Sequence, residues 1–236
     1  MKWNQVESDH YVFYIHLGSL AEKDLDEIVE IQERCFRYIR HVLKIDMEEK
    51  IHYYLCESED EVGAYYGDFS PCTGFSKAPN EIYVVYNRKK KWIGFHEISH
   101  LMANQISYQN SVALREGLAM FFDQKWCAIH NLEWVIYLLE SDAYVSLQKL
   151  MKDQLFYDYP AYMTYPVLGA FTQYLILTYG LDNYLKLYRM KGQTLNKCFK
   201  DVYDCSMKMI ESEFLDYVSL FKLDHVVRER LIEQLN

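Results

Sequence analysis

The sequence lacks most of the features that mark an extracellular, fibrous or nucleic-acid-binding protein. Its 236 residues include six cysteines, but none are spaced as a CxxC pair, which excludes a typical thiolate zinc site or small disulfide scaffold. The 25 lysines and arginines are outnumbered by 34 aspartates and glutamates, which argues against a surface that follows phosphate backbones or anionic lipid. Four prolines and nine glycines leave little material for flexible linkers. We therefore expect reduced thiols, an ordered chain and no nucleic-acid partner.

Long hydrophobic runs and export signals are also missing. The longest weakly polar run, Val167 to Tyr179, is too short and too polar to span a bilayer. The N-terminal residues carry acidic side chains early and lack the apolar segment and cleavage site of a signal peptide. These absences predict a cytoplasmic protein with no membrane partner, and they leave the oligomeric state open.

Apolar residues are abundant, at 50% of the chain, and their spacing changes along it. Strand patterns at 11–17, 51–56 and 81–86 surround a helical pattern at 20–43 and a loop at 67–80 that is rich in Gly, Pro and Ser. After residue 90 the pattern becomes helical, with helices expected at about 91–107, 111–128, 131–141, 146–152, 166–179, 182–190 and within 195–232. This order predicts an α+β fold: a small N-terminal mixed sheet with a long helix in residues 1–90, then a mainly helical lobe in residues 91–236. We expect the two parts to form one compact catalytic unit.

The chemistry is concentrated in residues 96–100, which read His-Glu-Ile-Ser-His. On a helix, His96 and His100 lie on one face with Cβ atoms about 5–6 Å apart. Both imidazoles can then reach one zinc ion at about 2.0–2.1 Å. Glu97 projects about 100° away, so that it can reach a water at the metal without being a ligand. This spacing predicts the metal-binding helix of an HExxH hydrolase.

A possible third ligand follows in the segment Leu-Arg-Glu-Gly-Leu-Ala, residues 114–119. Two histidines and a glutamate are one of the standard ligand sets of catalytic zinc, which keeps a fourth position open. The polar segment at 107–110 allows the second helix to fold back and bring Glu116 toward the histidines. Gly117 costs a helix about 1 kcal/mol relative to Ala, which suits two helices that approach closely at the metal. The plainer alternative is that His96 and His100 lie on a polar face and Glu116 is a surface acid.

These motifs resemble those of a known enzyme group. HEISH followed by LREGLAMFF is similar to the gluzincin zinc metallopeptidases, and more closely to the peptidase MA-like group, whose pattern is HExxH followed by an EGLA segment. The segment from Tyr165 through Gly169-Ala170-Phe171 to Tyr179-Gly180 also resembles that group. The resemblance implies a zincin-like fold and a hydrolase that cleaves peptide bonds with Zn²⁺ as its cofactor.

Carried over residue by residue, the resemblance implies that His96, His100 and Glu116 bind zinc and that Glu97 is the general base. It also implies that Tyr165 donates a hydrogen bond to the oxyanion of the substrate, a role that a donor aimed at developing charge can fill. Because Tyr165 precedes Pro166, we expect it at the entrance of a helix with its ring free to project. Three other tyrosines compete for this role or serve as packing: Tyr157, Tyr159 and Tyr162.

Asp123 is a candidate for supporting a metal ligand. It lies seven residues after Glu116 and on the same helical face, where its carboxylate could accept a hydrogen bond from a ligating imidazole. An ordinary helix-surface acid is the equally simple interpretation.

The function expected from this set is zinc-dependent hydrolysis of a peptide or protein substrate, with endopeptidase activity as the first choice. The strand at Glu81 to Tyr86 is expected at the edge of the sheet beside the cleft, where an extended peptide could pair with it. The alternative is a non-catalytic peptide-binding or regulatory module that retains the metallopeptidase fold. Zinc content together with hydrolysis of a peptide library separates the two.

Overall fold

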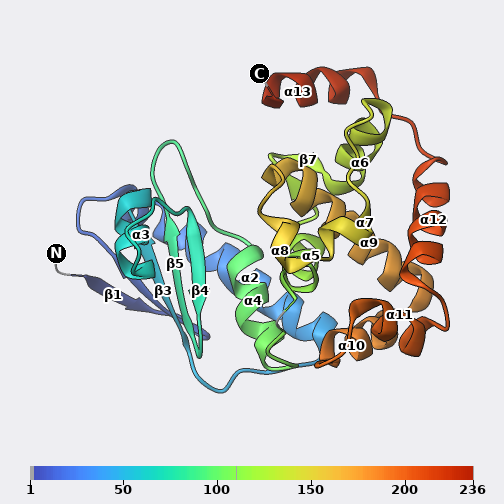
Figure 1. Cartoon of the computed structure of the whole chain (residues 1–236). Helices are drawn as coiled ribbons and strands as arrows, with labels where there is room; N and C mark the ends of the chain where they lie inside the picture. Colours follow the sequence, from blue (N-terminus) through green and yellow to red (C-terminus); the bar gives the residue numbers. More distant parts are fainter. Residues whose placement is uncertain (1–2, 110, 236) are drawn as a thin grey trace. The chain divides into compact units, whose positions relative to one another are not determined.

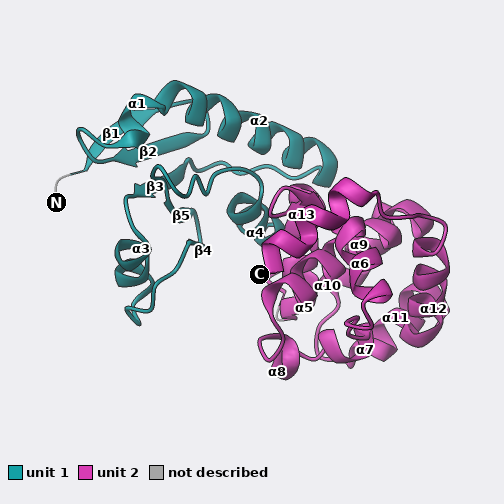
Figure 2. Cartoon of the chain, turned by 90° about the horizontal axis from the view of Figure 1, so that it is seen from above, with its two compact units in different colours: residues 1–106 teal, residues 107–236 magenta. Residues whose placement is uncertain are grey.

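The computed structural model describes residues 3–109 and 111–235, and these residues divide into two compact units, 1–106 and 107–236 (Figure 2). The observed architecture is α+β, with a small mixed sheet and many helices. Each unit is described by itself.

The first unit contains a five-stranded sheet with the strand order β1-β2-β3-β5-β4 (Figure 1). The strands are β1 (Asn4–Glu7), β2 (Tyr11–Ile15), β3 (Ile51–Cys56), β4 (Gly74–Lys77) and β5 (Glu81–Val85). β2, β3 and β5 are mutually parallel, and β1 and β4 pair antiparallel at the two sides. The expectation of a mixed sheet is thus confirmed.

The prediction that residues 81–86 form the edge strand is wrong. β5 pairs with β3 on one side and with β4 on the other, so β4 is the edge. β4 lies inside the segment predicted to be an irregular loop, because its sequence, Gly-Phe-Ser-Lys, is too short and too polar to show a strand pattern. The sequence pattern does not predict β1 either, because Asn-Gln-Val-Glu is equally short and polar.

The two faces of the sheet are covered differently. On one face, Tyr11, Phe13 and Tyr53 are buried, and Tyr11 meets Phe36 of the long helix edge to face. That helix, predicted over 20–43, is divided at Asp24 into α1 (Leu20–Lys23) and α2 (Leu25–Leu43). α3 (Glu59–Tyr66) follows β3 and was not predicted.

On the other face, four aromatic rings occupy directly opposite positions on neighbouring strands. Tyr14 pairs with Tyr54, Tyr54 with Tyr83, and Phe75 with Tyr83, and each pair of rings is stacked with centroids 4.2, 4.4 and 4.9 Å apart. Cross-strand aromatic pairs of this kind fix the register of a sheet. They therefore hold β4 in place although its own sequence is a weak strand former.

The last helix of the first unit is α4 (His96–Asn104), which begins five residues later than predicted. Lys91 forms an isolated β-bridge with Tyr86, and Gly94 has a φ of 131°, so the chain cannot be helical before residue 95. α4 packs against β4 and α2. For this reason the boundary between the units lies at 106/107, whereas the sequence pattern placed it at 90/91.

The second unit is helical. Its elements are α5 (Val112–Asp123), a short hairpin of β6 (Lys125–Trp126) and β7 (Ile129–His130), then α6 (Asn131–Glu140), α7 (Leu147–Leu150), α8 (Asp153–Phe156), α9 (Ala161–Tyr179), α10 (Leu181–Arg189), α11 (Leu195–Tyr203), α12 (Met207–Val218) and α13 (His225–Leu235). The helix predicted to continue to residue 128 stops at Asp123, because Gln124, Cys127 and Ala128 have positive φ angles and form the hairpin.

α9 also begins earlier than predicted, at residue 161, and contains Pro166. Proline inside a helix removes one backbone hydrogen bond and disfavours the turn before it. Ten residues of α9 are buried, and this packing outweighs the local cost. Within the part of the chain that is described, no helix is long and apolar enough to cross a membrane.

Candidate metal centre

The start of α4 is held by a buried glutamine of α2. Gln32 is fully buried, and with its amide oriented to satisfy both of its groups, its oxygen accepts from the Gly94 N–H at 2.8 Å and from the Tyr53 hydroxyl at 3.1 Å. Its nitrogen donates to the Gly94 carbonyl at 3.3 Å. A buried side-chain amide needs such partners, and these bonds tie Gln32 to the turn that leads into the HExxH helix.

His96 and His100 lie one turn apart on α4. Their ring centroids are 5.0 Å apart and their planes meet at 87°. Both side chains are partly exposed, whereas Ile98, Leu101 and Met102 of the same helix are buried. Ser99 donates a hydrogen bond from its hydroxyl to the Phe95 carbonyl at 2.6 Å, which satisfies this hydroxyl within the helix.

Glu116 lies on α5, which is anchored within the second unit. The Val112 N–H at its start donates to the Asp153 carboxylate at 2.8 Å, and the Tyr184 hydroxyl donates to the Leu114 carbonyl at 3.3 Å. Glu116 itself is buried, with 7% exposure. Glu116 is therefore not a surface acid, and its buried carboxylate requires compensating partners.

Gly117 allows a close helix approach, but its partner differs from the expected one. A Cβ atom at Gly117 would lie 2.5 Å from Oγ1 of Thr172 and 3.2 Å from the Leu168 carbonyl oxygen, both on α9. Gly169 of α9 is equally tight, since a Cβ there would lie 2.7 Å from Cβ of Met120. The glycine beside Glu116 thus serves the packing of α5 on α9, and through it the placement of Glu116.

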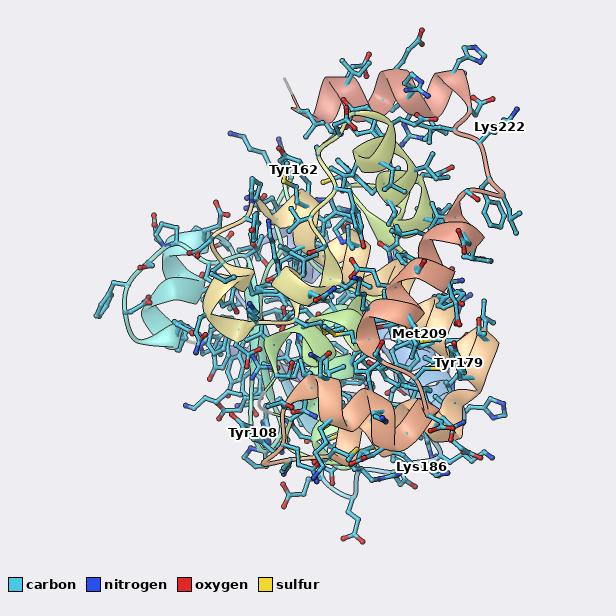
Figure 3. The ribbon with its side chains drawn as sticks, turned by 45° about the vertical axis from the view of Figure 1, so that its right-hand side comes forward. Tyr108, Tyr162, Tyr179, Lys186, Met209 and Lys222 are labelled. Atoms are coloured by element: carbon cyan, nitrogen blue, oxygen red, sulfur yellow. The ribbon has the colours of Figure 1, made fainter. Side chains whose placement is uncertain are left out.

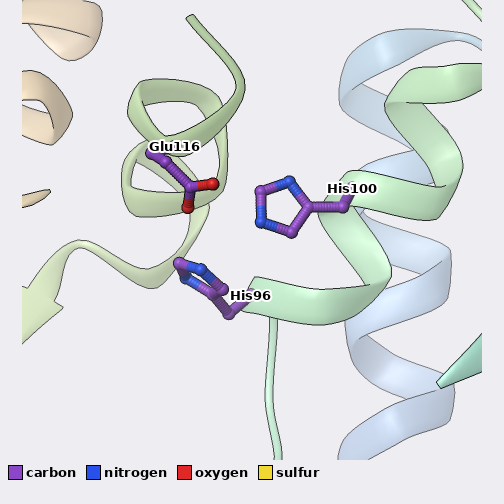
Figure 4. Close-up of side chains that lie close together, drawn as sticks. All are labelled: His96, His100 and Glu116. Atoms are coloured by element: carbon purple, nitrogen blue, oxygen red, sulfur yellow. The ribbon is translucent and has the colours of Figure 1, made fainter. Parts of the chain in front are cut away.

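The potential ligand atoms of His96, His100 and Glu116 all lie within 4.8 Å of one another (Figure 4). Figure 4 shows the two imidazoles projecting from one helix and the carboxylate from another, all turned toward a common point. Ligands at about 2.0–2.1 Å in a tetrahedral zinc site are roughly 3.4 Å apart, so shifts of about an ångström would complete the geometry. Two imidazoles and a carboxylate also match the donor preference of zinc. The residues therefore fit a zinc ion.

Glu97 lies beside the start of β4 in the first unit. It is buried, with 8% exposure, and a Cβ atom at Gly74 would lie 3.1 Å from its Oε1 and 2.8 Å from Cδ1 of Trp92. A side chain at position 74 would therefore press on both Trp92 and the Glu97 carboxylate. On the sheet side, burial and, to a smaller extent, the charge of Glu97 raise the pKa of Tyr53 well above its usual value, so that this tyrosine stays protonated.

Tyr165 is not at a helix entrance, because α9 begins at Ala161 and Tyr165 lies in its second turn. Its ring is not free: it stacks on Trp126 at 5.1 Å and meets Phe156 edge to face at 5.4 Å. The Tyr165 side chain is partly exposed. Its role toward an oxyanion stays a prediction.

The competing tyrosines and Asp123 have the following places. Tyr157 is exposed, and its ring meets Phe156. Tyr162 packs on Trp134 in a small apolar cluster, which is a structural role. Asp123 is the last residue of α5 and is partly exposed. Its contact with a ligating imidazole stays a prediction.

Comparison with known proteins adds no relative, because neither the protein-family models nor the curated proteins give a match. The interpretation of the three grouped residues as a metal site therefore rests on their own chemistry and placement.

Three residues of the site were not found from the sequence: Gln32, Tyr53 and Gly74. Each acts through a tertiary neighbour that is distant in the chain, which no local pattern indicates. Gln32 offered one signal, since it is a polar residue at an inward position of the α2 pattern.

Proposed function

We propose that this chain is a zinc-dependent metallopeptidase that cleaves within peptide chains. The observation that carries the proposal is the combination at α4: two histidines grouped with Glu116, and Glu97 lying against an open sheet edge. A zinc ion bound there would polarise the scissile carbonyl and lower the pKa of the attacking water.

His96, His100 and Glu116 would hold the ion. Three protein ligands leave a fourth position for water or substrate, which is the arrangement of catalytic zinc sites and differs from the closed four-ligand arrangement of structural ones. The partial exposure of both histidines is consistent with access from solvent.

Glu97 would accept the proton of the attacking water and deliver it to the leaving amine. A general base must be held within hydrogen-bond reach of that proton, and the Glu97 carboxylate lies beside the start of β4, where a Cβ atom at Gly74 would be 3.1 Å from its Oε1.

The peptide would be bound by β4. This strand pairs with β5 on one side, and among the described strands it has no partner on the other. An extended peptide can add to such an edge through main-chain hydrogen bonds, which select peptide-like substrates of varied sequence. Because Gly74 begins β4 and a Cβ atom there would lie 3.1 Å from Oε1 of Glu97, a peptide on this edge would pass close to the base.

Tyr165 would donate its hydroxyl to the developing oxyanion. Packing against Trp126 and Phe156 restricts its ring, so that the hydroxyl would be placed before the substrate arrives.

The proposal is tested with the purified full chain, its bound metal and a mixed library of unstructured peptides, followed by mass spectrometry. We expect one zinc per chain and cleavage at internal peptide bonds, with no cleavage by the Glu97→Gln variant purified in parallel. Zinc binding without turnover would contradict a peptidase and favour the non-catalytic peptide-binding module. Absence of zinc would contradict the zinc-dependent peptidase.

A further inference from the structure

A second site is indicated within the helical unit, at two adjoining hollows between α7, α8, α10, α11 and the start of α12. The first hollow has a volume of about 470 Å³, and it shares Gln148, Thr194 and Asn196 with the second. A volume of this size lies within the range of small-molecule sites.

The rim of these hollows is basic in a chain with a net charge of −9. Five lysines line them: Lys152, Lys191, Lys197, Lys200 and Lys208. Throughout residues 3–109 and 111–235, none of the five forms an ion pair. The one carboxylate in the lining, Asp153, accepts a hydrogen bond from the Val112 N–H. The lysines are thus positive charges without a protein counterion.

One further feature points to an anion. α11 begins in the shared part of the hollows, and its first residue is preceded by Thr194, whose side chain makes no capping hydrogen bond. The N–H groups of a helix start attract negative charge.

The floor of the first hollow is suited to an organic group. It contains the buried side chains of Met151, Leu187, Cys198 and Met207. Exposed amide side chains around it can donate and accept hydrogen bonds: Gln148, Gln154, Gln193 and Asn196. Ammonium groups bind phosphate as point charges, and an apolar floor with a few polar groups fixes the rest of a ligand.

We infer that these hollows bind a small organic phosphate, with its phosphate among the lysines and the start of α11, and its organic part over the methionine floor. The site is separate from the metal centre in its residues, and it does not depend on the proposed peptidase activity.

The test is calorimetric titration of the full chain at low ionic strength with three probes: AMP, inorganic pyrophosphate and adenosine. AMP should bind most tightly, because it has both charge and an organic part, and adenosine least. The affinity for AMP should fall as salt is raised, since exposed charges are screened. Failure of both AMP and pyrophosphate to bind, or equal binding of adenosine and AMP, would overturn the inference.

Two double variants locate the site. Lys191→Ala with Lys197→Ala removes one lysine from each hollow and should weaken AMP binding by about tenfold or more, because each ammonium group would bind the phosphate as a point charge. The matched control is Lys186→Ala with Lys222→Ala, two exposed lysines of the same unit that lie outside both hollows (Figure 3). The control should bind AMP like the parent. Equal loss in both double variants would show general charge attraction and overturn the site.

Because phosphates also bind metals, the titration is repeated with the His96→Ala, His100→Ala double variant. AMP binding should persist there unchanged. Loss of binding in this variant would assign the anion to the metal centre and overturn a second site.

Discussion

Replacement of Gly117 by alanine tests how Glu116 is held. At an ordinary helix position, Gly→Ala stabilises by about 1 kcal/mol. At Gly117 the new Cβ would lie 2.5 Å from Oγ1 of Thr172 and 3.2 Å from the Leu168 carbonyl oxygen. The first distance is roughly 1 Å inside normal contact, and overpacking of this kind costs about 1–3 kcal/mol. We therefore expect a net loss of up to about 2 kcal/mol in the free energy of unfolding.

The assay is a double-mutant cycle by urea and thermal unfolding of the metal-free protein. Thr172→Ala removes the hydroxyl that obstructs the new methyl group, so Gly117→Ala should be neutral or stabilising in that background. The coupling between the two sites should be about 1–2 kcal/mol, and each kcal/mol should shift Tm by about 2–4 °C. Zinc affinity gives a second readout, because a shift of α5 on α9 displaces Glu116: it should fall in Gly117→Ala and recover in the double variant.

The sign of the stability change in Gly117→Ala tests whether α5 packs closely on α9. If Gly117→Ala raised stability by about 1 kcal/mol, as at an exposed helix position, the close packing of α5 on α9 would be refuted. If stability fell but the coupling with Thr172 were zero, the loss would come from another contact and the steric reasoning would fail.

Four further predictions concern the site itself. His100→Ala should lose the bound zinc, measured by metal analysis of the purified protein, and undiminished zinc would refute the ligand assignment. Glu97→Gln should keep zinc but lose hydrolysis, so wild-type kcat on a cleaved peptide would exclude the general-base role. Tyr165→Phe keeps the ring that packs on Trp126 and should lower kcat by about 10²–10³ with zinc content unchanged; an unaltered kcat would transfer or remove the oxyanion role. Gln32→Leu leaves the buried Tyr53 hydroxyl and the N–H and carbonyl of Gly94 without their side-chain partner and should cost about 1–3 kcal/mol in urea unfolding. A loss below about 0.5 kcal/mol, the range of surface substitutions, would contradict its anchoring role.

The part of the site that the sequence predicts best is the part defined by local geometry. The i, i+4 spacing fixes His96 and His100 on one side of any helix, whatever that helix packs against. The long amphipathic pattern of α2 predicts a helix for the same reason, since its period is a property of the segment alone. Glu116 required one further assumption, that the next helix folds back, and the grouping of the three side chains agrees with it.

The parts that were missed depend on tertiary packing. β4 is a strand because Phe75 stacks on Tyr83 in the neighbouring strand, and nothing within Gly-Phe-Ser-Lys requires it. Proline favours the first turn of a helix and so predicts a helix start at Pro166, but burial along α9 stabilises a helix that begins at Ala161 and continues through it. In both cases long-range contacts outweighed local preference, and the edge strand and the placement of Tyr165 were consequently misassigned.

Gln32 shows that a buried polar residue can indicate how structural elements are connected, which the apolar residues around it do not. Leucine at this position of α2 would suit the buried face, whereas a buried amide is unfavourable unless all its groups are bonded. Its partners are the two backbone groups of Gly94 and the hydroxyl of Tyr53. The charge of Glu97 acts on the same tyrosine and contributes to its raised pKa. The amide therefore connects α2, the sheet and the entrance of the HExxH helix. Apolar contacts alone would allow these elements to shift slightly against one another, whereas directional hydrogen bonds favour one relative position. That position determines how the Glu97 side chain lies relative to Gly74.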